Sequence, residues 1–236
     1  MKHLLQINDL FAARPSDEPV PTGASAVQPC GAAPFTFQAV TGGQLGHVGR
    51  DLVLNYHYSG TFHPVYVLMG LAYQGSEAVA ACCFRTPAAR WRYPVLELAR
   101  LVRKDESAIP LTWLISKTVT AVKHAGAYDL LISYADQTHK HHGGIYQAAS
   151  WNFSHQTSRQ NDGVIVDGTF IAGRACNNKF GTRSVTKLEG LFPGQSFVAH
   201  WDEGKYLYWR ALSRKAEREA EKLGLKKSPF PKPMWE

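Results

Sequence analysis

The sequence is poor in features that define several common protein classes. It has four cysteines, and none stands in a C-x-x-C pair, which argues against a zinc knuckle. No apolar run approaches the ~20 residues of a membrane helix, so we expect no membrane partner. The first residues, MKHLLQINDLFAARPSDEP, lack the apolar block of a signal peptide. Together these absences predict a reduced, cytoplasmic protein.

Acidic residues are in the minority. There are 26 Lys and Arg against 19 Asp and Glu, which gives a formal net charge of +7. This balance favours an anionic partner, with nucleic acid as the first candidate. A merely basic soluble protein would have the same balance, so charge alone leaves both interpretations open. Hydrophobic residues make up 44% of the chain, enough for a full core.

The patterns of polarity predict an α/β (α+β) protein with a mixed sheet flanked by helices. Residues 1–34, rich in Pro, Gly, Ala and Ser, are predicted to form an N-terminal arm. Residues 35–212 are predicted as the main domain, in the order strand, helix, hairpin, strand, long helix, strand, short helix and further strands. Ser107 is expected to cap the long helix and Gly126 to end it. Residues 213–236 are predicted as a charged helix and a basic tail.

One stretch, DLLISYADQTHKHHGGIYQAASW at 129–151, is richest in titratable and hydrogen-bonding groups. Leu130 to Ile132 predict a buried strand, and Ser133 and Asp136 are expected where that strand ends. Polar residues in this position are where α/β folds place ligand chemistry. The histidines of the following loop stand close together, which predicts some metal affinity. They are His139, His141 and His142.

Two further places carry candidate site residues. His57 and Tyr58 are expected at the end of a helix that closes at Gly60. Glu97 and Arg100 lie on a predicted strand, and in an ideal strand they would point to opposite faces. A bulge would change that alternation. Arg100 could hold a carboxylate or phosphate, or pair with an acid such as Glu97.

Four short segments, in this order, resemble the Mom family of Mu-like phages. They are HYS at 57–59, ELARL at 97–101, SYAD at 133–136 and HHGGIYQA at 141–148. The predicted order of strand, long helix, strand and short helix is similar to the core of GNAT acyltransferases. The resemblance implies a GNAT-like catalytic domain over 35–212. It also implies an enzyme that converts adenine in DNA to an N6-carbamoylmethyl (glycinamide-like) derivative and so protects phage DNA from host restriction.

The resemblance further implies double-stranded DNA as partner, iron as a bound metal and the host cytoplasm as location. A homodimer is left open as a second kind of partner. Asp136 is expected to ligate the metal or to accept a proton from adenine N6, with His57 as its metal partner. Tyr58 and Tyr146 are expected to orient the donor or ligate the metal, and Ser133 to hydrogen-bond substrate. Of the three loop histidines, His142 best fits the family pattern.

The donor of the transferred group is not specified by these motifs. GNAT enzymes bind the CoA pyrophosphate on a Gly-rich turn before the long helix. Here that turn is VRKDESAIP, which has no glycine and two acids. This argues against acetyl-CoA, and a glycine-derived donor is the other candidate. Two alternative functions stay open: a conventional GNAT N-acetyltransferase that uses acetyl-CoA, and a non-enzymatic DNA-binding protein.

Overall fold

The computed structural model describes residues 34–41, 46–62, 65–139 and 141–232. The predicted N-terminal arm thus lies outside the described residues, apart from Pro34. Within them, the chain divides into two compact units. The first unit holds residues 34–41, 46–62, 65–133, 145–152 and 209–226, and the second holds 134–139, 141–144, 153–208 and 227–232.

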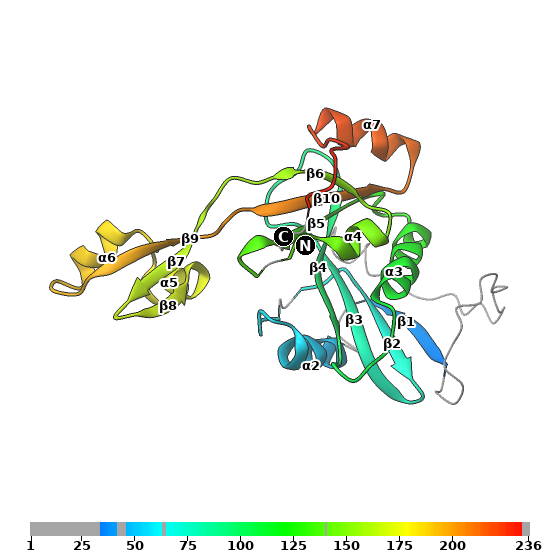
Figure 1. Cartoon of the computed structure of the whole chain (residues 1–236), viewed down its shortest axis with the longest axis horizontal. Helices are drawn as coiled ribbons and strands as arrows, with labels where there is room; N and C mark the ends of the chain where they lie inside the picture. The colour runs from blue at the N-terminus through cyan, green and yellow to red at the C-terminus, as the bar shows by residue number, and fades with distance from the viewer. Residues whose placement is uncertain (1–33, 42–45, 63–64, 140, 233–236) are drawn as a thin grey trace, which may run out of the picture. The chain divides into compact units, whose positions relative to one another are not determined.

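The larger sheet has seven strands in the order β1-β2-β3-β4-β5-β10-β6 (Figure 1). The first four strands pair antiparallel in succession, and β5 runs parallel to β4. A parallel pair needs a crossover connection, and helix α3 (Leu111–Ala125) supplies it. The strands are β1 (Phe35–Val40), β2 (Leu68–Gln74), β3 (Glu77–Arg85), β4 (Val95–Arg103), β5 (Leu130–Asp136), β6 (Asn152–Gln156) and β10 (Lys205–Ala211).

Two helices of the first unit cover opposite faces of this sheet. Successive side chains of a strand point to opposite faces. On β2, Met69 and Leu71 lie against α2 (Gly46–Tyr56), while Gly70 between them lies against Thr118 of α3. The apolar residues of α2 pack into the same buried cluster as Met69 and Leu71. The sheet therefore has a core on each side.

Helix α7 (Arg214–Lys222) completes the first unit. Its N-cap Ser213 accepts a hydrogen bond from Ala216 N at 3.0 Å, as its sequence predicts. Ala216 and Ala220 are fully buried, so the small residues of this otherwise charged helix face the unit's interior. The predicted boundary at 212/213 stays a prediction, as does the boundary at 34/35.

The second unit contains a three-stranded sheet in the order β8-β7-β9. The turn between β7 and β8 has positive φ at Asp167 (50°) and Gly168 (76°), which suits a tight hairpin. Val164, Cys176, Leu188 and Phe197 form its buried cluster. The elements are β7 (Asn161–Val166), β8 (Thr169–Ala172), β9 (Phe197–Trp201), α5 (Gly173–Phe180), α6 (Val185–Leu191) and the short η1 (Gln137–His139).

The predicted α/β class, with a mixed sheet flanked by helices, is confirmed. The order β4, α3, β5 and the short α4 (Gly144–Ala148) also follows the predicted one. No helix in the described ranges is long and apolar enough to cross a membrane.

Three local predictions are corrected. Ser107 does not cap α3, because the helix begins only after Pro110 and the residue before a proline disfavours helical geometry; Ser107 Oγ instead accepts from Ile109 N. Strand β5 continues through Ser133 and ends at Asp136, so Ser133 is not at the strand end. The strand β9 was not predicted.

Gly70 should not tolerate a side chain. A Cβ there would overlap Thr118 Oγ1 and lie 2.8 Å from Phe37 Cε2. We expect Gly70→Ala to lower the free energy of unfolding by about 1–3 kcal/mol through overpacking, measured by denaturant unfolding. The control is Gly46→Ala in α2, where a Cβ meets only Met69 Cε at 4.0 Å. Equal stability of the two variants would contradict this packing of α3 on β2.

Candidate active site

A buried acid, Glu97, lies in the middle of the sheet. Its neighbours along β4, Leu96 and Leu98, are buried apolar residues, and Glu97 itself is only 8% exposed. Arg85, its register partner on β3, donates from Nη2 to Glu97 Oε1 at 3.0 Å. Acids are rarely buried without such a partner. The pair fixes one carboxylate at a defined place in the first unit.

Tyr146 and Ser133 belong to the same unit as this carboxylate. Ser133 on β5 is fully buried and donates to Leu98 O at 2.7 Å. A hydrogen bond also links Ser133 and Tyr146. Burial raises the pKa of Tyr146 well above its ordinary value, and the nearby Tyr58, Cys82 and Glu97 raise it further against the opposing bond to Ser133. Tyr146 is therefore a neutral hydroxyl.

Four side chains from distant segments interact through coulombic effects or hydrogen bonding, with Tyr146 as the common partner. They are Tyr58 after α2, Glu97 on β4, Ser133 on β5 and Tyr146 on α4. Tyr58 is 52% exposed, so its ring lies at the surface above buried polar groups. The arrangement offers an exposed ring, two ordered hydroxyls and a carboxylate within one unit.

His57 stacks on Tyr58, with ring centroids 4.3 Å apart. Its Nδ1 accepts from Ser59 N at 3.1 Å and lies 2.9 Å from Ser59 Oγ. Because Nδ1 accepts a backbone N–H, neutral His57 carries its hydrogen on Nε2. Thr61 Oγ1 donates to Ser59 Oγ at 3.3 Å, which continues the chain of hydrogen bonds toward Arg100.

Arg100 ends this chain of hydrogen bonds. Its Nε and Nη2 donate to Thr61 O (3.2 Å) and Thr61 Oγ1 (3.1 Å), and its Nη1 donates to Ala99 O (2.7 Å). Arg100 thus holds the 57–61 loop, while Glu97 pairs with Arg85. Its predicted contact with a substrate anion stays a prediction.

The bulge considered for β4 is present. Arg100 lies opposite Cys83 and Leu98 lies opposite Phe84, so Ala99 is the extra residue. The alternation of an ideal strand therefore does not hold between Glu97 and Arg100. Cys82, next along β3, bonds to Thr118, and burial raises its pKa to about 12.

Asp136 belongs to the second unit, where its carboxylate is held on both oxygens. Oδ2 lies 3.2 Å from Lys205 Nζ, and Oδ1 accepts from Thr138 N at 3.1 Å. His139 and His141 stand beside it, with ring centroids 6.2 Å apart. Burial, and then the neighbouring His139, lower the pKa of His141, against the attraction of Asp136. Asp136, the last residue of β5, therefore lies among basic groups. Its place in the sequence just before three histidines predicts such surroundings.

The backbone of the HHGG segment is fixed by Tyr208. Its hydroxyl donates to His142 O at 2.6 Å. Gly143 has φ of +81°, and a Cβ there would overlap the Tyr208 ring. The glycine is thus required by both conformation and space.

The predicted site residues fall into two groups. Tyr58, Ser133 and Tyr146 meet in the first unit, with His57 and Arg100 joined to them through the 57–61 loop. Asp136 and the histidines 139, 141 and 142 lie in the second unit. Glu97 and Arg85 were missed as site residues, although an acid inside the apolar run VLELARLV is a recognisable signal. No three His, Cys, Asp or Glu side chains within the described ranges are placed to hold a metal ion.

The raised pKa of Tyr146 predicts a pH dependence of stability. The neutral form is favoured by folding, so its contribution is complete below the ordinary pKa of 10.0 and is lost as pH rises above it. We expect the free energy of unfolding to fall less steeply above pH 10 in Tyr146→Phe than in the unchanged protein. Denaturant titrations across alkaline pH would measure this, and equal slopes would contradict the assigned environment.

Arg100→Lys should loosen the 57–61 loop. A lysine cannot reproduce the two bonds to Thr61, so amide hydrogen exchange in this loop should quicken by roughly tenfold. The control is Arg103→Lys, because Arg103 donates to Ile109 O instead. Unchanged exchange in Arg100→Lys would show that Arg100 does not hold the loop.

The chain was compared with known proteins. No curated protein matches it. Solved structures that are similar include a Bacillus subtilis acetyltransferase in complex with CoA (10% identity, 75% of this chain and 100% of that chain, TM-score 0.43). A second is a GNAT family acetyltransferase from Elizabethkingia anophelis with acetyl-CoA bound (12%, 75% and 98%, TM-score 0.41). A third is an acetyltransferase of the GNAT family from Streptococcus pneumoniae (10%, 75% and 99%, TM-score 0.43).

A protein-family model gives the decisive match. The model of the Mom protein family covers residues 46–232, most of the chain. The matched region includes all four segments that carry the resemblance. The chain therefore belongs to the Mom protein family, and this membership supports a role in phage DNA modification.

Proposed function

We propose that this protein is a transferase that modifies adenine in double-stranded phage DNA. The product is N6-carbamoylmethyladenine, which protects the phage DNA from host restriction. The observation that carries the proposal is that Tyr58, Glu97 and Ser133 each interact with Tyr146. Each comes from a different one of the segments by which the chain resembles the Mom family. Shared local sequence and shared location in the first unit support a common chemical role.

The reaction sets clear demands on these residues. Adenine N6 is a weak nucleophile, because its lone pair is delocalised into the ring. A new bond forms between N6 and the methylene carbon of the donor, and the bond from that carbon to the leaving group breaks. The leaving group takes the electron pair, and N6 loses one proton. The base must also leave the helical stack, at the expense of a few kcal/mol.

The first unit holds groups suited to each demand. Glu97 is the acceptor for the N6 proton, and Arg85 holds its carboxylate in place. The Ser133 hydroxyl is ordered by its bond to Leu98 O, and together with the Tyr146 hydroxyl it can orient a polar substrate. The exposed ring of Tyr58, backed by His57, is a surface on which an unstacked base can rest. Positioned acid–base groups of this kind contribute ~100–10,000-fold to rates.

Asp136 is the other candidate acceptor, as its sequence position predicts. Lys205 and Thr138 N fix its carboxylate in the second unit. The variants below separate the two acids.

Iron binding stays a prediction that the reaction steps above do not use. His57 and Asp136 were its predicted ligands, and the described residues offer no group of three ligand side chains. No step above therefore depends on a metal. Metal analysis of the purified protein would decide whether iron is bound, and sedimentation would decide whether the chain forms a homodimer. The host cytoplasm remains the expected location.

The donor is proposed to carry a carbamoylmethyl group. A glycine-derived molecule is the first candidate, and acetyl-CoA is disfavoured. The turn before α3 bears the exposed acids Asp105 and Glu106. Pro110 precedes the helix and has no N–H to offer a phosphate. These features support a donor other than CoA.

Nucleoside mass spectrometry on plasmid DNA from cells that make the protein tests the proposal. We expect a deoxyadenosine species heavier by one carbamoylmethyl group. Glu97→Gln should reduce this product by about 100-fold or more, because the proton acceptor is lost. Asp136→Ala should abolish the product if that acid acts instead. Glu77→Gln, an exposed acid on β3, is the matched control and should leave the yield unchanged.

Each other outcome has a distinct meaning. Unmodified deoxyadenosine from folded protein would overturn the proposal. An acetylated amine together with tight acetyl-CoA binding would establish a conventional N-acetyltransferase. Retention of DNA with no change in nucleoside mass would establish a DNA-binding protein without enzyme activity.

A further inference from the structure

The loop between β3 and β4 forms a hollow on the first unit that the proposed chemistry does not use. Its volume is about 530 Å³. The side chains that matter most line its wall: Arg90, Trp91, Arg92, Tyr93 and Tyr128. Such a hollow combines cations with aromatic rings, which is the chemistry that binds nucleotides.

The cations of the hollow are available to a ligand. Between Arg85 and Val95 the chain has three arginines and no acid. Arg85 pairs with the buried Glu97, while Arg90 and Arg92 are exposed. Across the described part of the chain, neither of these two arginines makes an ion pair. Two uncompensated guanidinium groups within one short loop suit phosphates.

The aromatic side chains of the hollow are held in place. Trp91, Tyr93 and Tyr128 are half-buried. Tyr93 donates its hydroxyl to Asp129 Oδ1 at 2.7 Å, and Ser213 donates to Asp129 Oδ2 at 2.6 Å. Burial, helped by the bond to Asp129, raises the pKa of Tyr93 to about 12, so its ring stays neutral. Tyr93 thus offers a fixed ring for stacking.

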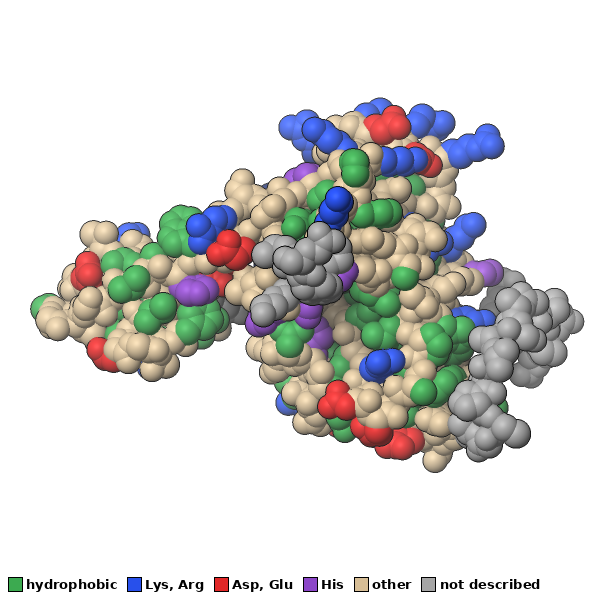
Figure 2. Space-filling model, viewed as in Figure 1, with side chains coloured by type: hydrophobic (Ala, Val, Ile, Leu, Met, Phe, Trp, Pro, Cys, Tyr) green, Lys and Arg blue, Asp and Glu red, His purple; other side chains and the backbone are tan. Residues whose placement is uncertain are grey.

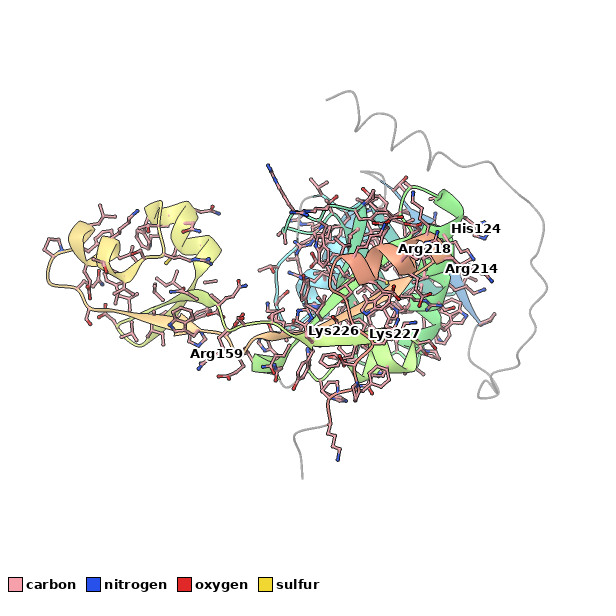
Figure 3. The ribbon with its side chains drawn as sticks, turned by 90° about the horizontal axis from the view of Figure 1, so that it is seen from above. His124, Arg159, Arg214, Arg218, Lys226 and Lys227 are labelled. Carbon is pink, nitrogen blue, oxygen red and sulfur yellow. The ribbon has the colours of Figure 1, made fainter. Side chains whose placement is uncertain are left out.

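Helix α7 extends this charge beyond the hollow. Lys215 Nζ lies 5.7 Å from the centroid of the Tyr93 ring, which joins the helix to the hollow. Figure 2 shows Lys and Arg side chains gathered over α7, and Figure 3 labels Arg214 and Arg218 on that helix. Both arginines are exposed. The acids of the helix partly offset its charge, and Glu219 pairs with Lys222 at 2.8 Å.

The hollow lies close to the active-site groups along the sheet. Val95 contributes to its wall and is two residues from Glu97 on β4, or about 7 Å along the strand. Tyr128 precedes β5, the strand that bears Ser133. That spacing is close to the distance between neighbouring nucleotides of an extended strand.

We propose that this hollow binds a nucleotide that flanks the target adenine in DNA. The base stacks on the aromatic wall, and the phosphates pair with Arg90 and Arg92, with α7 tracking the backbone onward. The inference rests on the proposed function, since it takes DNA as the substrate. It adds a place where the enzyme holds the strand next to the modified base.

The test measures binding of a fluorescein-labelled DNA duplex by anisotropy at several salt concentrations. Loss of two phosphate contacts in Arg90→Ala/Arg92→Ala should weaken binding by roughly tenfold or more and make the salt slope less steep by about 2. The matched control is Arg50→Ala/Lys117→Ala, which removes the same charge from exposed sites on α2 and α3. Trp91→Leu should weaken binding by roughly fivefold or more, with little change of salt slope. Thermal unfolding checks that each variant is folded.

The outcomes separate this inference from the proposed function. If both double variants weaken DNA binding equally, the hollow is not a nucleotide site and only a general charge effect remains. If Arg90→Ala/Arg92→Ala binds DNA normally and still modifies it, the hollow is not a nucleotide site, while the proposed function stands. Absence of DNA binding by the unchanged protein would overturn both. Competition by free deoxyadenosine monophosphate as strong as by DNA would show a mononucleotide site and overturn the assignment to the DNA strand.

Discussion

The ion pair between Arg85 and Glu97 is the constraint on which the candidate site depends. It joins β3 to β4 inside the core, at 3.0 Å. A buried carboxylate that lost its partner would leave an uncompensated charge, which is strongly destabilising. The pair therefore fixes both the position of the acid and the register of the strands that carry it. Among the described residues, the buried Arg85 Nε has no hydrogen-bond partner, so the pairing with Glu97 does not satisfy the whole guanidinium.

Other features of the first unit are arranged around that pair. The parallel strand β5 brings Ser133 opposite Leu98, the residue after Glu97. The bulge at Ala99 then turns Arg100 toward the 57–61 loop, where it fixes the segment that bears His57 and Tyr58. Strand β4 thus carries the Glu97 carboxylate itself and, through Arg100, holds the loop that bears His57 and Tyr58. The site depends on the local geometry of β4 more than on any single loop.

The sequence was informative where pattern and chemistry agreed. Alternating and apolar runs predicted β1, the β2–β3 hairpin, β4 and β5, and Gly126 ends the long helix with φ of 72° as expected. Ser133 and Tyr146 were found by their place in the motifs. A pair between Glu97 and Arg100 was left open, because the register that gives Glu97 to Arg85 depends on pairing between strands that a single sequence does not reveal. Ser107 looked like a cap, and only the restriction imposed by Pro110 excludes it.

The burial of the adjacent thiols has a kinetic consequence. Cys82 lies near Tyr146, and with a pKa of about 12 its thiolate fraction at neutral pH is about 10⁻⁵. Desolvation raises the pKa of Cys83 as well. Both thiols therefore stay protonated near neutral pH, which makes them poor nucleophiles toward the donor.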